Sequence, residues 1–177
     1  MASKNVPLVG LKNLYIGDIA SDGGMGTGLT PVSYSVEGTP VLTFEEGEQT
    51  DFPIEESDNP YYVIKTPGNK TFTLSIYGIN AATMYKHFGG VLTPGATSAD
   101  PDVWAAPAQF PELEKSIVAE HKQGGYLAIV RAKLNVTAEW KFQKSGLPQL
   151  NIEAIILAPT KDGVAPFTLY HGGDYTP

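Results

Sequence analysis

Residues 130–142, VRAKLNVTAEWKF, decide the fold because apolar and polar side chains alternate through the whole stretch. Every second residue from Val130 to Phe142 is apolar, and the residues between them are polar or charged. Successive side chains of a strand point to opposite faces, so the stretch predicts one strand with an apolar and a polar face. Thirteen extended residues would span about 40 Å, well beyond the usual five or six residues, which predicts a bend or bulge.

Two other stretches repeat this alternation and predict further strands. In residues 71–77, Phe72, Leu74 and Ile76 alternate with threonine, serine and tyrosine. Residues 150–156 carry a third such set, and the break SGLP before them predicts a hairpin with the long strand. Shorter strands are expected at residues 13–19, 32–36, 41–45, 61–65, 116–121 and 167–170.

One short helix stands out among these strands, at residues 81–88. Asn80 can cap it, because its side-chain oxygen can accept a hydrogen bond from the first turn. Apolar side chains then fall on one face at helical spacing. The pair Gly89-Gly90 ends the helix, since glycine tolerates the left-handed conformation that follows a helix. A single short helix is expected to cover an open face or end of a sheet.

Three stretches predict long loops, at residues 20–31, 45–60 and 93–111, because they are rich in glycine, acidic residues and proline, respectively. Loops beyond about a dozen residues are uncommon in compact domains unless they have a function or stay mobile. We therefore expect surfaces that order against neighbouring subunits. The whole pattern predicts one domain over residues 1–177 with a mainly β fold, in which antiparallel sheets form a β-sandwich or barrel-like arrangement and one short α-helix packs on the sheet.

The composition excludes several kinds of site. The chain contains no cysteine, which excludes disulfides and thiolate metal ligands. Its formal net charge of -7 opposes nonspecific capture of a nucleic-acid backbone, although it suits a lumen through which nucleic acid slides. Residues 1–11 lack the apolar run of a signal peptide, and no stretch reaches the ~20 apolar residues of a membrane span. We expect a soluble protein made in the cytoplasm, without a membrane partner.

The sequence also lacks the usual motifs of enzyme chemistry. The glycine-rich stretch at residues 23–28 has no Gly-Lys-Ser or Gly-Lys-Thr, whose lysine would reach a phosphate. His87, His121 and His171 lie outside the spacings of metal sites. No Gly-x-Ser-x-Gly motif provides a serine nucleophile. We therefore expect no catalytic residue, no cofactor and no metal site.

Residues 45–58 hold a dense cluster of carboxylates. The spacing of a 12-residue calcium-binding loop is absent from it. One interpretation is a solvated loop, since charged clusters usually stay in water. The other is an acidic patch that faces a partner or a lumen. The acidic candidates for contact between subunits are Glu45, Glu46, Glu48, Asp51, Glu55, Glu56 and Asp58.

The polar face of the long strand carries three basic residues, Arg131, Lys133 and Lys141. One interpretation is the solvated outside of a one-sided antiparallel sheet. The alternative pairs this basic face, or Lys115 and Lys122, with the acidic loop of a neighbouring subunit. Charge complementarity of that kind sets register and orientation more than affinity.

Two aromatic residues, Trp104 and Phe110, lie inside the proline-rich stretch without an evident local core. One possibility is that they pack back on their own domain. The other is that they dock into another chain, as aromatic anchors commonly do. The sequence leaves both possibilities open.

In the order and composition of its segments the chain resembles the bacteriophage tail tube proteins. These are also called major tail proteins and are relatives of the type VI secretion tube subunit. Its opening segment LKNLYIG at residues 11–17 is similar to that of the family, and a glycine-rich stretch and an acidic loop follow. The part most like the family is KTFTLSIY at residues 70–77, which leads into the short helix and its glycine pair. The hairpin of residues 126–142 with residues 150–157 is the other landmark.

The resemblance implies a structural, non-enzymatic virion protein. In such proteins six copies close a ring through sheet pairing, and the rings stack into a hollow tube whose loops and N-terminal arms join one ring to the next. The lumen is acidic, so DNA passes without specific binding. The implied partners are copies of the chain itself, other tail proteins and DNA in transit. The implied location is the virion tail, after synthesis in the bacterial host cytoplasm.

Two other classes of function stay open. A β-sandwich that binds carbohydrate or another ligand could use Tyr61, Tyr62, Trp104 and Tyr126 as stacking surfaces. An enzyme with a site assembled from distant residues ranks last, because no nucleophile–base or metal spacing is present.

Overall fold

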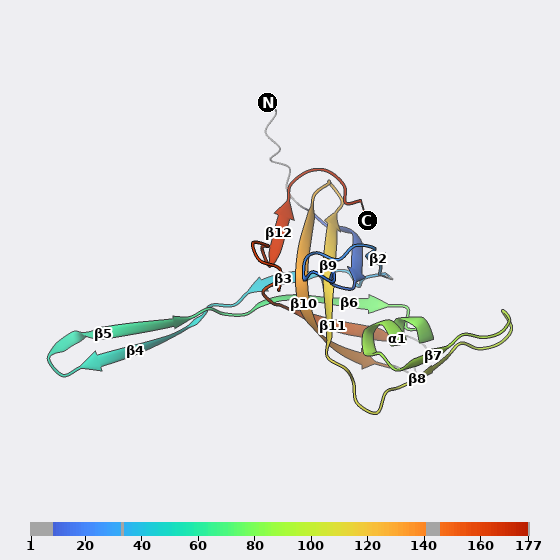
Figure 1. Cartoon of the computed structure of the whole chain (residues 1–177), viewed down its shortest axis with the longest axis horizontal. Helices are drawn as coiled ribbons and strands as arrows, with labels where there is room; N and C mark the ends of the chain where they lie inside the picture. Colours follow the sequence, from blue (N-terminus) through green and yellow to red (C-terminus); the bar gives the residue numbers. More distant parts are fainter. Residues whose placement is uncertain (1–8, 33, 141–145, 177) are drawn as a thin grey trace.

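The computed structural model describes residues 9–32, 34–140 and 146–176, and antiparallel strands dominate its regular structure (Figure 1). The large sheet has eight strands in the order β2-β1-β9-β10-β11-β6-β3, with β12 paired to β10. These strands are β1 (Leu11–Gly17), β2 (Thr30–Pro31), β3 (Val41–Phe44), β6 (Lys70–Tyr77), β9 (Leu113–His121), β10 (Tyr126–Glu139), β11 (Gln149–Ile156) and β12 (Phe167–Tyr170).

Two small sheets and one helix complete the described part of the chain. Each small sheet is a pair of antiparallel strands. The elements are β4 (Glu48–Ile54) with β5 (Ser57–Thr66), β7 (Val91–Thr93) with β8 (Val103–Ala105), and α1 (Ala81–Phe88). The prediction of a mainly β, antiparallel fold with one short helix is confirmed.

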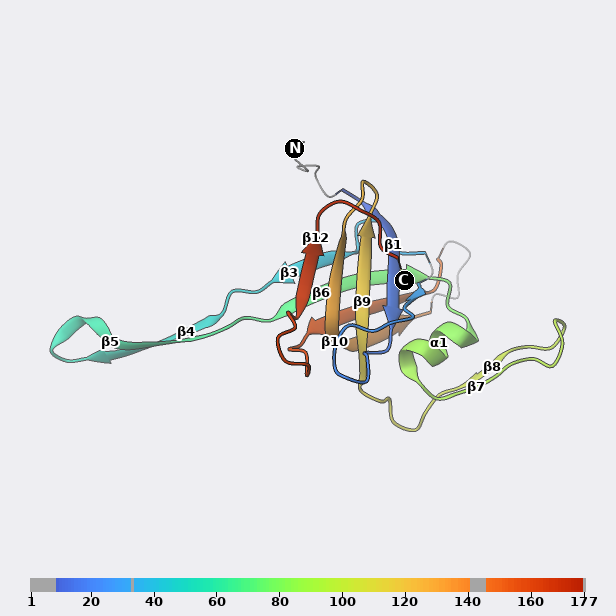
Figure 2. The same ribbon diagram turned by 45° about the horizontal axis from the view of Figure 1, so that its top comes forward.

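Strand β10 joins the two halves of the large sheet. Its first part pairs with β9 on one side and β12 on the other, where Ile129 lies opposite Phe167. Its second part pairs with β11 from Ala132 to Glu139, which confirms the predicted hairpin. The register shifts between Ile129 and Ala132, and this irregularity is the bend or bulge that the strand length predicts. Figure 2 shows β12, β10, β9 and β1 side by side.

The register shift decides which side chains of β10 enter the core. Before it, Leu127 and Ile129 belong to the core, and after it Ala132, Leu134 and Val136 do. A regular strand would send odd and even residues to opposite faces along its whole length. The shift therefore turns both parts of β10 toward the same core.

The core lies between the apolar faces of the curled sheet. The alternating sets of β6 and β11 both line it, as their patterns predict. Two residues, Ile16 of β1 and Ile117 of β9, are fully buried beside them. The buried members of the sets in β6 and β11 are Phe72, Leu74, Ile76, Leu150, Ile152 and Ala154.

Helix α1 has the predicted ends. The side chain of Asn80 accepts a hydrogen bond from the backbone N–H of Thr83 at 2.8 Å. At the other end the backbone of Gly89 adopts a φ of 69°, and its N–H donates to the carbonyl of Tyr85. The helix buries Met84 and His87, and Met84 joins the core of the sheet.

The prediction of a loop over residues 45–60 is wrong, because β4 and β5 form a hairpin there. Acidic residues and Pro53 hide the strand signal in the sequence. Proline is tolerated in strands at edges and bulges, and Pro53 lies where the register shifts between Phe52 and Ile54. Figure 1 shows the hairpin projecting far from the large sheet.

The other two expected loops are irregular for most of their length. Residues 20–31 contain β2, and residues 93–111 contain the end of β7 and all of β8. The strand expected at residues 32–36 is wrong, since the described residues there form only an isolated bridge between Ser35 and Ile76. The large sheet does not close into a barrel, because its described strands leave it open, with β2 and β3 at its ends.

Candidate functional site

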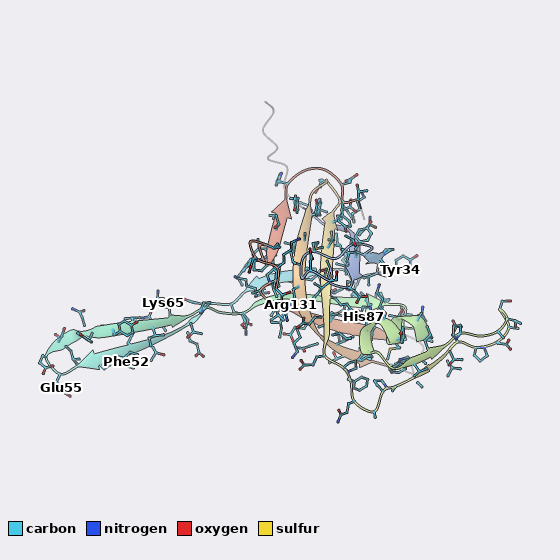
Figure 3. The ribbon with its side chains drawn as sticks, viewed as in Figure 1. Tyr34, Phe52, Glu55, Lys65, His87 and Arg131 are labelled. Carbon is cyan, nitrogen blue, oxygen red and sulfur yellow. The ribbon has the colours of Figure 1, made fainter. Side chains whose placement is uncertain are left out.

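The β4–β5 hairpin stands away from the rest of the protein with both faces in solvent. Every residue of its two strands is exposed, and within the described part the strands pair only with each other. The seven extended residues of β4 make the ribbon about 23 Å long. Figure 3 shows Phe52 and Lys65 along the ribbon and Glu55 at its tip. A two-stranded hairpin without further packing is marginally stable in water.

One face of this hairpin is apolar. Phe52 lies opposite Tyr62 and Thr50 lies opposite Ile64, so these four side chains share a face, which we call the apolar hairpin face. The ring centroids of Phe52 and Tyr62 are 6.3 Å apart. Both rings and Ile64 are nevertheless 44–60% exposed. Contiguous exposed apolar side chains of this kind mark interaction surfaces.

The seven acidic candidates all lie on or beside the hairpin. Glu45 and Glu46 are at its base, Glu48 and Asp51 are on β4, and the other three are at or next to the tip. None of the seven forms a salt bridge with a residue that the structure describes. The members at the tip are Glu55, Glu56 and Asp58.

The basic candidates on β10 find acidic partners in their own chain. The guanidinium of Arg131 donates two hydrogen bonds of 2.8 Å to the carboxylate of Glu114, which lowers the pKa of that carboxyl. The ammonium of Lys133 lies 2.6 Å from Glu112. The third candidate, Lys141, lies outside the described residues. The charges of Arg131 and Lys133 are therefore matched without a neighbouring subunit.

The two aromatic candidates differ in their surroundings. The indole N–H of Trp104 donates to the carbonyl of Gly89 at 2.8 Å, and its ring packs against Phe88 and the core. Phe110 meets Phe88 edge-on but stays 62% exposed. Trp104 thus packs back on its own domain, whereas Phe110 keeps a free surface.

A cavity of about 520 Å³ between α1, β1 and β9 brings two lysines together. Lys115 pairs with Asp18, whereas Lys86 hydrogen-bonds to the hydroxyl of Thr30 and forms no salt bridge with a described residue. Burial, and then the charge of Lys115, lower the pKa of Lys86. We call this cavity the lysine pocket. Sequence reasoning missed Lys86, because a lysine in the last turn of a helix is an ordinary partner of the helix dipole.

A larger groove of about 940 Å³ lies where β3 and β12 face each other. Its apolar lining includes Leu42, Phe44 and Phe167, and its charged side chains include Glu37 and Lys122. The rings of Phe44 and Phe167 touch with their centroids 5.7 Å apart. The groove is an apolar site that could not be predicted from the sequence, since its walls come from segments far apart in the chain.

The four aromatic residues considered for carbohydrate stacking do not meet. Tyr61 and Tyr62 lie on the hairpin, and Trp104 packs beside α1. The ring of Tyr126 is stacked on Tyr170 at 4.4 Å. These side chains therefore form no common platform for a sugar.

The described residues contain no group of three histidine, aspartate or glutamate side chains placed to hold a metal ion. The described helix, with eight residues, is too short to cross a membrane. No protein-family model and no curated protein matches the chain. The tail tube resemblance therefore rests on the order of its elements and stays a prediction.

Proposed function

We propose that this protein is a structural, non-enzymatic subunit that assembles with copies of itself, and that the β4–β5 hairpin is its joining element. The observation that carries the proposal is the apolar hairpin face, which the described part of its own chain leaves in solvent. A hairpin of this kind gains stability when a neighbouring subunit covers that face.

Covering the apolar hairpin face on assembly would contribute favourable free energy through the burial of apolar side chains. Burying a phenylalanine or isoleucine side chain completely contributes about 1.5–3 kcal/mol, and these side chains are already about half covered. Covering Phe52, Tyr62 and Ile64 would therefore contribute roughly 1 kcal/mol each. These three side chains together would contribute roughly 3 kcal/mol to each contact, repeated around a ring, toward the cost of association.

The shape supports a head-to-tail contact between subunits. The hairpin projects from one end of the long axis, and α1 with β7 and β8 lies at the other end (Figure 1). A contact between two different surfaces closes into a ring or continues as an open filament, depending on the rotation between subunits. Rings of six copies stacked into a phage tail tube are the assembly that the tail tube resemblance implies.

The charge balance suits the same role. With a net charge of -7 and carboxylates along the hairpin that form no salt bridge with a described residue, the subunit repels a nucleic-acid backbone. We propose that such a tube, located in the virion tail and attached to other tail proteins, conducts DNA without binding it.

Light scattering and electron microscopy over a range of protein concentrations test this proposal. We expect rings or tubes above a threshold concentration, and a higher threshold for the double variant Phe52→Ser with Tyr62→Ser. The matched control is Tyr34→Ser, because Tyr34 is 85% exposed outside the hairpin. Wild-type protein that stays monomeric at every concentration would overturn self-assembly, and an unchanged double variant would remove the hairpin from the contact.

A second candidate function is the binding of an apolar ligand in the groove between β3 and β12. Its support is the volume of about 940 Å³ and the apolar lining. A rise in melting temperature with fatty acids or apolar dyes, abolished by Leu42→Trp, would favour this function over assembly. It ranks second because it does not explain why the apolar hairpin face is exposed.

A further inference from the structure

The lysine pocket has one more positive charge than the described part of its own chain neutralises. Two ammonium groups, Lys86 and Lys115, line it together with the single carboxylate of Asp18. Asp18 pairs with Lys115 and its side chain is 88% exposed, whereas Lys86 is partly buried beside the hydroxyl of Thr30. A partly buried ammonium without a carboxylate partner has lost hydration that a second carboxylate could replace.

Among the described residues that line the pocket, Asp18 carries the only negative charge. His87, next to Lys86, is buried and uncharged near neutral pH, because burial lowers its pKa to about 4. The remaining lining consists of apolar side chains, Tyr85, Thr30 and glycines of β1 and two loops. The open space of about 520 Å³ is wide enough to admit a side chain of another molecule.

The tip of the hairpin carries the opposite charge in an accessible form. Ile54 pairs with Ser57, so Glu55 and Glu56 form the turn between the two strands. Their side chains, and that of Asp58, are exposed and form no salt bridge with a described residue. The hydroxyl of Ser57 accepts a hydrogen bond from the backbone N–H of Asn59, which helps to hold the turn.

The tip and the pocket cannot meet within one chain. Figure 3 shows Glu55 at the far end of the hairpin and His87 on α1, on the opposite side of the molecule. Complementary charges at opposite ends of one subunit fit a head-to-tail contact between two copies.

We propose that the carboxylates of Glu55 and Glu56 of one copy bind in the lysine pocket of a neighbouring copy, against Lys86 and Lys115. This inference rests on the self-assembly proposed above and names the surface that receives the hairpin. The ion pairs fix the direction and register of the contact, while the apolar hairpin face supplies the buried area. The occupant is thus a second copy of this chain.

Charge exchange between the two surfaces tests the inference. We expect Lys86→Glu alone, and Glu55→Lys with Glu56→Lys alone, each to raise the threshold concentration for assembly by about tenfold or more. An equimolar mixture of the two proteins should assemble near the wild-type threshold, because each acidic pocket then meets a basic tip. The matched control is Lys122→Glu, which changes an exposed lysine outside the pocket.

A coupling experiment gives a readout that does not depend on variants. A carbodiimide joins a carboxylate to an amine only when the two are in contact. Treatment of assembled wild-type protein should yield an amide between Glu55 or Glu56 and Lys86, identified by mass spectrometry. Mixing isotope-labelled with unlabelled subunits shows whether the two residues come from different copies.

The outcomes separate the two proposals. If wild-type protein assembles while the charge variants keep the wild-type threshold and no tip–pocket amide forms, the inference is wrong and self-assembly stands. If wild-type protein never assembles, self-assembly and the inference both fail. The tip variants change exposed residues of the hairpin, so circular dichroism should show the wild-type fold and a lost contact cannot be ascribed to unfolding.

Discussion

His87 carries a charge state that its burial controls. Its side chain is almost fully covered, and its Nδ1 has no hydrogen-bond partner in the described structure. Burial, and then the charges of Lys86 and Lys115, lower its pKa from 6.5 to about 4. The folded protein therefore holds this imidazole neutral under conditions in which the unfolded chain would protonate it.

This shift predicts a loss of stability in mild acid. Between pH 6.5 and 4 the unfolded chain binds a proton at His87 that the folded protein excludes, so the free energy of unfolding falls as the pH falls. We expect a loss of about 2 kcal/mol between pH 7 and pH 5. Denaturant unfolding at the two pH values measures it.

The variant His87→Leu should remove most of this pH dependence, because leucine cannot bind a proton. His171→Leu is the control, since His171 is exposed and should leave the wild-type dependence unchanged. An equal loss of stability in wild type and His87→Leu would show that other groups cause the acid sensitivity.

Glu120 is a second buried titratable residue in the described part of the chain, and hydrogen bonds stabilise its charged form, in contrast to the neutral His87. Its side chain is 1% exposed, and burial raises its pKa. Hydrogen bonds from the amide of Asn13 and the ammonium of Lys12 outweigh burial, so the pKa is lowered overall. The carboxylate thus ties β1 to β9, and Lys12 extends the tie to Asp174 near the C-terminus.

At the scale of elements, the hairpin is separable from the sheet. Strands β4 and β5 form a sheet of their own. The chain enters and leaves them side by side, because the backbone N–H of Glu45 donates to the carbonyl of Asn69 at 2.9 Å. Removing the hairpin therefore takes nothing from the core.

We predict that replacing residues 48–66 with a two-residue glycine turn leaves the melting temperature within about 3 °C of wild type, because no residue of β4 or β5 is buried. The same deletion should abolish assembly. Calorimetry and light scattering measure the two effects. A large fall in melting temperature would mean that the hairpin supports the fold, contrary to its exposure.

The elements also show what the sequence can and cannot predict. Alternation identified β6, β10 and β11, because a strand with one buried face has apolar residues at every second position. The same rule missed β4 and the first part of β5, since both of their faces are exposed and no core selects apolar residues at every second position, although the strand expected at residues 61–65 does lie within β5. The exposed apolar face of the hairpin became visible only through the pairing of Phe52 with Tyr62.

At the scale of the whole molecule, the candidate sites differ in how far apart their residues lie in the sequence. The acidic cluster of residues 45–58 is contiguous, so its position on one projecting element followed once the hairpin was known. The lysine pocket joins β1, α1 and β9, which the fold alone brings together. Single-sequence reasoning could propose Lys115 as a charged contact but had no reason to add Lys86.

Hydrogen exchange of the free and the assembled protein should separate the two parts of the molecule. Amides of residues 48–66 should exchange quickly in free subunits, because an uncovered hairpin opens readily. Assembly should slow their exchange at least tenfold, while β9 and β10 stay protected in both states. Strong protection of the hairpin in the free subunit would contradict its marginal stability.

The acidic residues of the hairpin also bear on aggregation before assembly. A ribbon with two open edges and an apolar face is a template on which identical ribbons could stack into insoluble fibrils. Carboxylates along the ribbon and at its tip repel such like-with-like stacking, as gatekeeper residues do in other proteins. The same charges that we propose bind the lysine pocket of a neighbouring copy would therefore keep newly made chains from precipitating on one another.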